Sequence, residues 1–148
     1  MIMRLLYVSY AIMLLPCMMA SAAWYSITVS PDISLTVSPL LGDVSNVSAT
    51  LTYEFDTVGN YKIQVKGEGI PPWLDYLKVV ATDISPGGGT AAPEVTLSPT
   101  YIDFITGFGA STGSFSATPR YTVKMTTWAT AAGTSATVTV TYKFMEAP

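Results

Sequence analysis

The sequence predicts an all-β protein, a single immunoglobulin-like or jelly-roll β-sandwich of about eight to nine strands behind an N-terminal signal peptide. Three observations favour this fold. Apolar and polar residues alternate with a period of two in several stretches, turn residues separate these stretches at short intervals, and no stretch has a convincing helical periodicity. The length of 148 residues suits one domain.

Residues 1–23 are typical of a signal peptide. A positive charge precedes an almost unbroken apolar run over 5–20, and small residues follow at Ala20-Ser21-Ala22-Ala23. Cleavage there would remove Cys17, so the exported chain would hold no disulfide. Alternatively, residues 5–23 are long enough to form a membrane anchor or a type IV pilin helix. We expect an extracellular or cell-surface protein without a stable membrane span after the leader is removed.

The clearest alternation lies in residues 47–55. Turn residues follow it and lead into a second alternating stretch, 61–66, which predicts a hairpin. Alternation also predicts half-buried antiparallel strands over 120–125 and 136–144. The residues expected to face the core from these four strands are Val47, Ala49, Leu51, Tyr53, Phe55, Tyr61, Ile63, Val65, Tyr121, Val123, Met125, Ala136, Val138, Val140, Tyr142 and Phe144.

Weaker patterns predict three more strands, over 74–82, 95–97 and 114–118. Proline- and glycine-rich segments separate them, as expected for turns and loops. Residues 101–105 fit either a single turn or a short strand.

Residues 24–38 form a distinct N-terminal segment ahead of the sandwich domain, 39–148. The segment alternates from Trp24 to Ser30 and again after Pro31, so it is either an ordinary first strand or a strand donated to the groove of a neighbouring subunit. The opposite register stays open, because Trp24 alternates the other way. The residues expected to fill the groove are Tyr25, Ile27, Val29, Ile33, Leu35 and Val37.

The predicted leader, the alternating segment from Trp24 to Val29 and the Thr- and Val-rich sandwich resemble the subunits of archaeal surface threads and bundling pili. The resemblance implies a non-enzymatic filament subunit for adhesion or biofilm formation. Its partner would be a second copy of the same chain, in a head-to-tail homopolymer joined by donor-strand complementation. Surface glycans are common in such families, and the partners would include glycans or neighbouring filaments.

The composition excludes several functions. Charged residues make up 11% of the chain and the net charge is −3, so we expect no nucleic-acid partner. Histidine is absent and cysteine occurs once, which excludes Ser-His-Asp catalysis and an ordinary zinc site. Glu54 and Asp56 would share one strand face rather than oppose each other across a cleft, so we interpret them as solvated charges and not as a glycosidase pair.

Asp75, Asp83 and Asp103 are candidate calcium ligands together with loop carbonyls, but their spacing does not match a calcium loop. We expect no enzymatic activity, no catalytic residues, no cofactor and no metal site.

Two surface features suggest glycans. Asn46-Val47-Ser48 is an N-glycosylation sequon, which makes Asn46 an acceptor in an exported chain. Trp73, Tyr76 and Trp128 are candidates for a sugar-binding platform or a contact between subunits, although packing in the core or under a loop explains each of them as well. A secreted cell-surface or carbohydrate-binding module is therefore the second function hypothesis, and a membrane-anchored pilin-like subunit is the third.

Overall fold

The computed structural model describes residues 25–30, 34–37, 49–56, 59–108, 112–124 and 136–147. These residues form strands and loops, and no helix occurs among them. The strands are β1 (Tyr25–Ser30), β2 (Ser34–Val37), β3 (Thr50–Phe55), β4 (Tyr61–Glu68), β5 (Tyr76–Thr82), β6 (Thr90–Ala91), β7 (Val95–Thr96), β8 (Ile102–Thr106), β9 (Gly113–Lys124) and β10 (Ala136–Glu146).

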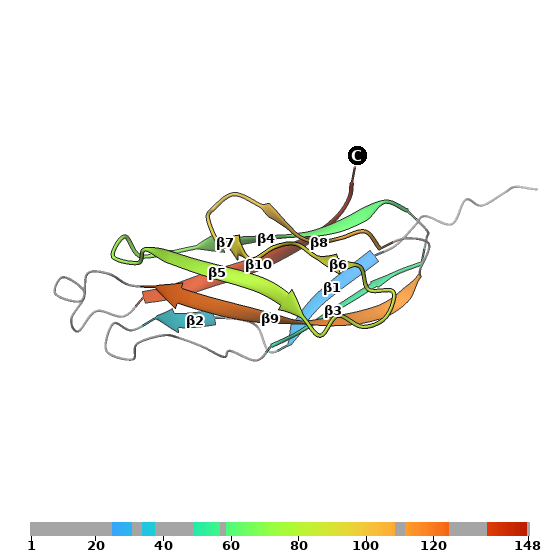
Figure 1. Cartoon of the computed structure of the whole chain (residues 1–148), viewed down its shortest axis with the longest axis horizontal. Helices are drawn as coiled ribbons and strands as arrows, with labels where there is room; N and C mark the ends of the chain where they lie inside the picture. Colours follow the sequence, from blue (N-terminus) through green and yellow to red (C-terminus); the bar gives the residue numbers. More distant parts are fainter. Residues whose placement is uncertain are drawn as a thin grey trace, which may run out of the picture.

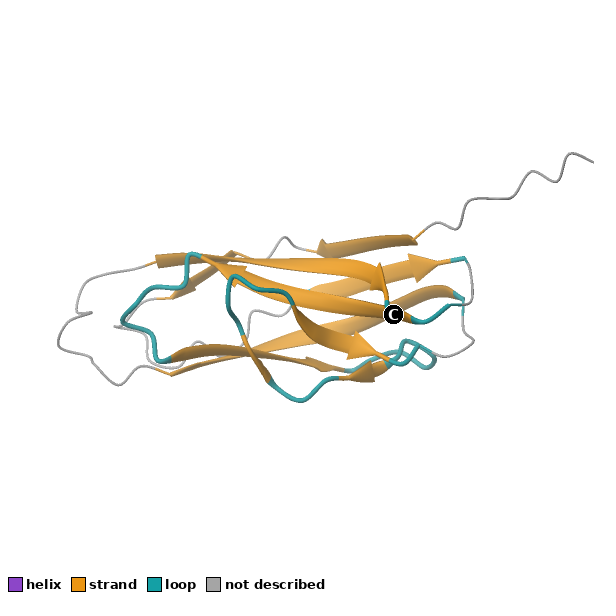
Figure 2. Ribbon diagram, turned by 90° about the horizontal axis from the view of Figure 1, so that it is seen from above, coloured by secondary structure: helices purple, strands orange, loops and turns teal. Residues whose placement is uncertain are grey.

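The strands pair into two five-stranded sheets, in the orders β1-β3-β9-β5-β7 and β2-β10-β4-β8-β6. Every strand pair is antiparallel. The two sheets lie face to face in two layers (Figure 2), which confirms the prediction of an all-β sandwich.

Both long sides of the sandwich are closed in the same manner. On one side the chain adds β1 to β3 of the first sheet and then β2 to β10 of the second sheet, so that β1 and β2 follow one another along the long axis (Figure 1). On the other side it adds β6 to β8 and then β7 to β5. Each side is thus covered by one segment that changes sheets, which protects the edges of the sheets.

The sequence predicted two strands separated at Pro119, and this prediction was wrong, because β9 runs through the proline. The carbonyl of Leu77 accepts a hydrogen bond from the amide of Leu97, so the backbone polar groups of Leu77 point toward β7. These groups alternate in direction along a strand with a period of two, so those of Ala81 also point toward β7. Pro119 pairs with Ala81, and at this position β5 and β9 form no hydrogen bond with each other. The missing N–H group of the proline therefore removes no bond from this ladder. Strand β3 pairs with β9 only as far as Ala117, so no bond is lost on that side either.

The shorter elements also differ in part from the prediction. Of the two alternatives left open for residues 101–105, the structure has the short strand, β8. Strand β5 begins at Tyr76 rather than at residue 74, and the two-residue strand β6 was not predicted. Strands this short carry too few residues for a periodic pattern, and their position depends on the neighbouring strand.

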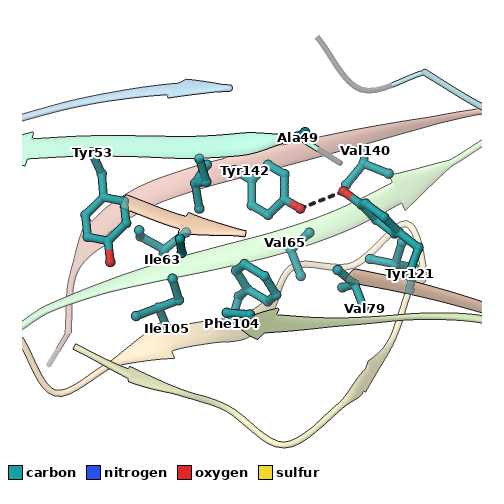
Figure 3. Packing of buried hydrophobic residues seen from close by; sticks show 14 of the residues in the cluster. Ala49, Tyr53, Ile63, Val65, Val79, Phe104, Ile105, Tyr121, Val140 and Tyr142 are labelled. Carbon is teal, nitrogen blue, oxygen red and sulfur yellow. Dashed lines mark hydrogen bonds between the residues drawn. The ribbon is translucent and has the colours of Figure 1, made fainter. Parts of the chain in front are cut away.

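A single hydrophobic core fills the space between the sheets (Figure 3). The alternation predicted the buried faces of β3, β4, β9 and β10 correctly wherever the structure describes them, except that Ala136 is only partly buried. The most deeply buried large side chains are Tyr53, Phe55, Phe104, Leu51, Ile63, Leu77, Ile105, Val65, Val79 and Val138.

Tyrosine hydroxyls in this core are paired. The hydroxyls of Tyr121 and Tyr142 lie 2.7 Å apart and join the two sheets through a hydrogen bond (Figure 3). The hydroxyl of Tyr53 donates to the carbonyl of Gly88, where a side chain would collide with that hydroxyl. Burial raises the pKa of Tyr53 to about 12, and it also raises the pKa values of Tyr121 and Tyr142. Aromatic side chains thus contribute apolar surface without leaving a buried hydroxyl unpaired.

Candidate functional site

The candidate site is the side of the sandwich that β1 and β2 close. Tyr25, Ile27 and Val29 pair with three residues of β3 that are at most 1% exposed, Phe55, Tyr53 and Leu51. Directly paired residues of antiparallel strands project to the same face of a sheet. Tyr25 and Ile27 therefore occupy core-facing positions of this strand.

Strand β1 also contacts the opposite sheet. The ring of Tyr25 stacks on that of Phe144 in β10, with 5.0 Å between the ring centroids. Phe144 is 4% exposed, whereas Tyr25 is 53% exposed. Ile27 is partly buried and packs against the core. Strand β1 thus seals the space between the two sheets, and its first residue remains accessible from outside.

Strand β2 completes the same side on the second sheet. Leu35 pairs with Val138, which is fully buried, and Val37 pairs with Ala136. The other residues predicted for this segment, Trp24 and Ile33, lie outside the residues that the structure describes.

A shallow, open cleft of about 380 Å³ lies at the end of the sandwich where β1 begins. Glu54 and Asp56 line it together with Thr112, Gly113 and Ser114. The two carboxylate residues thus line the same cleft. Residues 112–114 were not singled out in the sequence, and only the pairing of β3 with β9 brings them here.

Two of the three predicted surface aromatics, Trp73 and Tyr76, lie in the described part of the chain. Trp73 is partly buried and packs against the core in the turn before β5. Tyr76 begins β5, and the ammonium groups of Lys78 and Lys124 lie 4.6 and 5.9 Å from its ring centroid. Trp128, like the sequon residue Asn46, lies outside the described part of the chain.

A similar cluster surrounds Tyr101, which the sequence analysis did not single out. The ammonium groups of Lys66 and Lys143 lie 5.1 and 5.7 Å from the centroid of its ring. Lys66 also forms an ion pair with Glu68 at 2.7 Å, and the hydrogen bond in this pair raises the pKa of Lys66. The two lysines come from the neighbouring strands β4 and β10, which are far apart in the sequence, so no local sequence pattern predicts this cluster.

The candidate calcium ligands lie on separate elements. Asp103, in β8, accepts a hydrogen bond from Gln64 at 2.7 Å and pairs with Lys62 at 3.0 Å. These two contacts, that with Gln64 foremost, lower the pKa of Asp103. Asp75 precedes β5, and Asp83 follows it with a φ of 51°. In the described ranges, no three acidic side chains gather into a group that would hold a metal ion.

The part of the chain that the structure describes also contains no helix long and apolar enough to cross a membrane. The predicted leader lies outside that part.

Comparison with known proteins leaves the family open. No family model matches the chain, and no curated protein matches it. Among solved structures, the chain is similar to TmCBM61 in complex with β-1,4-galactotriose, with a TM-score of 0.35 and 11% sequence identity. The match covers 83% of this chain and 88% of that one.

Proposed function

We propose that this protein is a non-catalytic structural subunit of an extracellular filament, and that its N-terminal segment is donated to the next subunit. One observation carries the proposal. The segment supplies the edge strand of both sheets on one side of the sandwich, and Tyr25 and Ile27 of the first strand pair with the buried Phe55 and Tyr53.

On this side of the sandwich, the edge of β3 and the ring of Phe144 are covered by the N-terminal segment. Without β1, strand β3 would lose six paired residues along its free edge, and Phe144 would lose the ring that covers it. An open edge with apolar residues beneath it pairs readily with another strand. The same segment of a second copy supplies the same pairing partners and apolar side chains, so each subunit completes the next one. Repetition of this head-to-tail contact gives an open polymer.

Electron microscopy of two chains tests the proposal. The expected mature chain, residues 24–148, should form filaments, whereas a chain that begins at Pro39 should stay monomeric and should bind a synthetic peptide of residues 24–38. Monodisperse particles from the longer chain under all assembly conditions, or filaments from both chains, would contradict it.

Adjacent substitutions in β1 provide a matched pair. Ile27→Asp places a charge against the core and should abolish assembly, because a buried unpaired carboxylate is costly. Thr28→Asp places the same charge on the exposed face of the same strand and should assemble as the unmodified chain does. Equal assembly of the two variants would exclude β1 as the donated strand.

Glycan binding is the second candidate function, and the surroundings of Tyr76 favour it. Its side chain is only partly buried and lies beside the ammonium groups of Lys78 and Lys124, a combination that suits a saccharide with acidic groups. Calorimetric titration with acidic and neutral oligosaccharides tests this candidate. Tyr76→Ala should weaken any binding, and unchanged binding would exclude the site.

A further inference from the structure

Two lysines from neighbouring strands surround one tyrosine ring on the outer face of the first sheet. Lys78 of β5 pairs directly with Thr122 of β9, and Lys124 lies two residues beyond Thr122. The ring centroid of Tyr76 lies 4.6 Å from the ammonium group of Lys78 and 5.9 Å from that of Lys124. Lys78 also forms an ion pair with Glu94 at 3.2 Å. The residues on β5 and β9 alternate with buried ones, so their side chains point away from the core.

The outer face of the second sheet has the same arrangement around Tyr101. Lys66 of β4 pairs directly with Thr141 of β10, and Lys143 lies two residues beyond Thr141. The ring centroid of Tyr101 lies 5.1 Å from the ammonium group of Lys66 and 5.7 Å from that of Lys143. Lys66 forms an ion pair with Glu68 at 2.7 Å. These lysines also alternate with buried residues and point away from the core.

The two clusters agree in more than their composition. In each, one lysine pairs across the strands with the threonine of a Thr-x-Lys sequence and forms an ion pair with a glutamate. The lysine of the Thr-x-Lys sequence is exposed in both. Four of the five lysines in the sequence belong to these clusters, so the arrangement accounts for most of the lysine in this chain. Each cluster has two positive charges and one negative charge, which favours an anionic ligand although the net charge of the chain is −3.

Saccharides that carry carboxylate groups match both clusters. A tyrosine ring at a surface offers an apolar face against which a sugar ring packs, and a polar hydroxyl at its tip. Ammonium groups donate charge-assisted hydrogen bonds to carboxylates, and the threonine hydroxyl beside each pair of lysines bonds readily to sugar hydroxyls. Both clusters lie on the surface of a sheet, where the middle of a long saccharide chain has access as well as its end.

The two clusters face in opposite directions. Strands β5 and β9 belong to the first sheet, and β4 and β10 belong to the second. The sheets lie face to face with the core between them (Figure 2), so their outer faces are the two broad surfaces of the sandwich. Two packed sheets are ~10 Å apart, and the side chains on their outer faces add to this thickness. A short saccharide bound to one cluster therefore leaves the other cluster free.

We propose that the Tyr101 cluster is a second binding site for acidic saccharides, so that each copy of this protein joins two acidic polysaccharide chains, one on each outer face. This inference rests on the glycan-binding candidate at Tyr76 and is independent of strand donation. It adds a new site, defined by Tyr101, Lys66 and Lys143, and a cross-linking role. Along a filament both sites recur in every subunit, so that weak binding at each site adds up along a polysaccharide.

Calorimetric titration with a tetramer of galacturonic acid counts the sites, with the full chain expressed with its own leader. The unmodified protein should bind two tetramers per copy. Tyr76→Ala and Tyr101→Ala should each bind one, and the double variant should bind none. Tyr101→Phe, which keeps the ring, should still bind two. Urea unfolding of each variant checks that it folds, which is expected because both tyrosines are only partly buried.

Two further ligands and one pair of variants separate saccharide recognition from charge alone. The fully methyl-esterified tetramer has the same sugar rings without charge, and a tetramer of glutamate has the charge without the rings. Both should bind about tenfold more weakly than the acidic tetramer, or weaker still. With Tyr76→Ala as background, Lys143→Gln should weaken binding of the acidic tetramer, whereas Lys143→Arg should preserve it. Equal binding of the glutamate tetramer would contradict a saccharide site.

The outcomes separate the new site from the candidate at Tyr76. One tetramer per copy, lost in Tyr76→Ala and kept in Tyr101→Ala, would overturn the inference and leave the Tyr76 candidate intact. One tetramer, kept in Tyr76→Ala and lost in Tyr101→Ala, would refute the Tyr76 candidate and the joining of two chains with it. Binding that persists in the double variant, or no binding to the unmodified protein, would overturn both. None of these results bears on filament formation.

Light scattering with long polygalacturonate tests the cross-linking role, at protein concentrations at which the chain is monomeric. Scattering should rise when the unmodified protein is added, because each copy joins two polysaccharide chains. It should not rise with Tyr76→Ala or Tyr101→Ala, each of which keeps one site. An equal rise with either single variant would contradict the inference.

Discussion

Removing one hydroxyl from the Tyr121–Tyr142 pair should cost more stability than removing both. The two oxygens lie 2.7 Å apart in the core, and the side chains are 4% and 8% exposed. Tyr142→Phe leaves the hydroxyl of Tyr121 without this partner in a place that water hardly reaches. An unsatisfied buried hydroxyl costs about 1–3 kcal/mol, and the same cost applies to Tyr121→Phe.

The double variant leaves no hydroxyl behind at this position. It loses only the net contribution of one hydrogen bond, ~1 kcal/mol, and it gains a more apolar contact between the sheets. Because each single variant loses about 1–3 kcal/mol and the double variant only ~1 kcal/mol, the coupling energy between the two positions should be about 1–5 kcal/mol. The double variant should therefore be more stable than the single variants.

Urea unfolding of the four proteins measures this coupling. Tryptophan fluorescence follows the transition at protein concentrations at which the chain is monomeric, and equal m-values would show that the unfolded states are comparable. If the two single losses simply add in the double variant, each hydroxyl has another partner, and the argument from an orphaned buried group is wrong.

Three further predictions concern the core and one turn. Above pH 10, the free energy of unfolding should fall with increasing pH, because an unfolded tyrosine loses its proton near pH 10 whereas the pKa of folded Tyr53 is about 12. Denaturant midpoints measured across this range would show the decrease, and midpoints that do not change with pH would refute it. Phe55→Ala should cost about 3–5 kcal/mol, since this side chain is 1% exposed and central among the aromatic rings, and a loss below ~1 kcal/mol on urea unfolding would refute this. Both Gly89 and Gly107 have a positive φ, but Gly89→Ala should destabilise the protein more than Gly107→Ala. Of these two positions, only Gly89 would place a Cβ atom 2.8 Å from a backbone oxygen, that of Thr106. Equal thermal midpoints of the two variants would contradict this prediction.

Much of this protein follows from local pattern. A period of two specifies a half-buried strand without reference to its neighbours, and for this reason the buried residues of β3, β4 and β10 were predictable. The same pattern identified Tyr25, Ile27 and Val29 as one face of β1. The continuation of β9 through Pro119 was not predicted. The cost of a proline in a strand depends on the side toward which the neighbouring hydrogen bonds point, and the partner strands decide that side.

Other features of the candidate site required the tertiary structure. Alternation gives the face of a strand but not its sheet, so the placement of β1 on β3 and of β2 on β10 was not predictable from the segment itself. The stacking of Tyr25 on Phe144 and the lysines around Tyr101 join residues that are far apart in the sequence. Such contacts depend on how the two sheets align. The sequence by itself determined that strands form and which side of each one is buried, because both depend on neighbouring residues; only the packing of the sheets decided that the N-terminal segment closes one side of the sandwich.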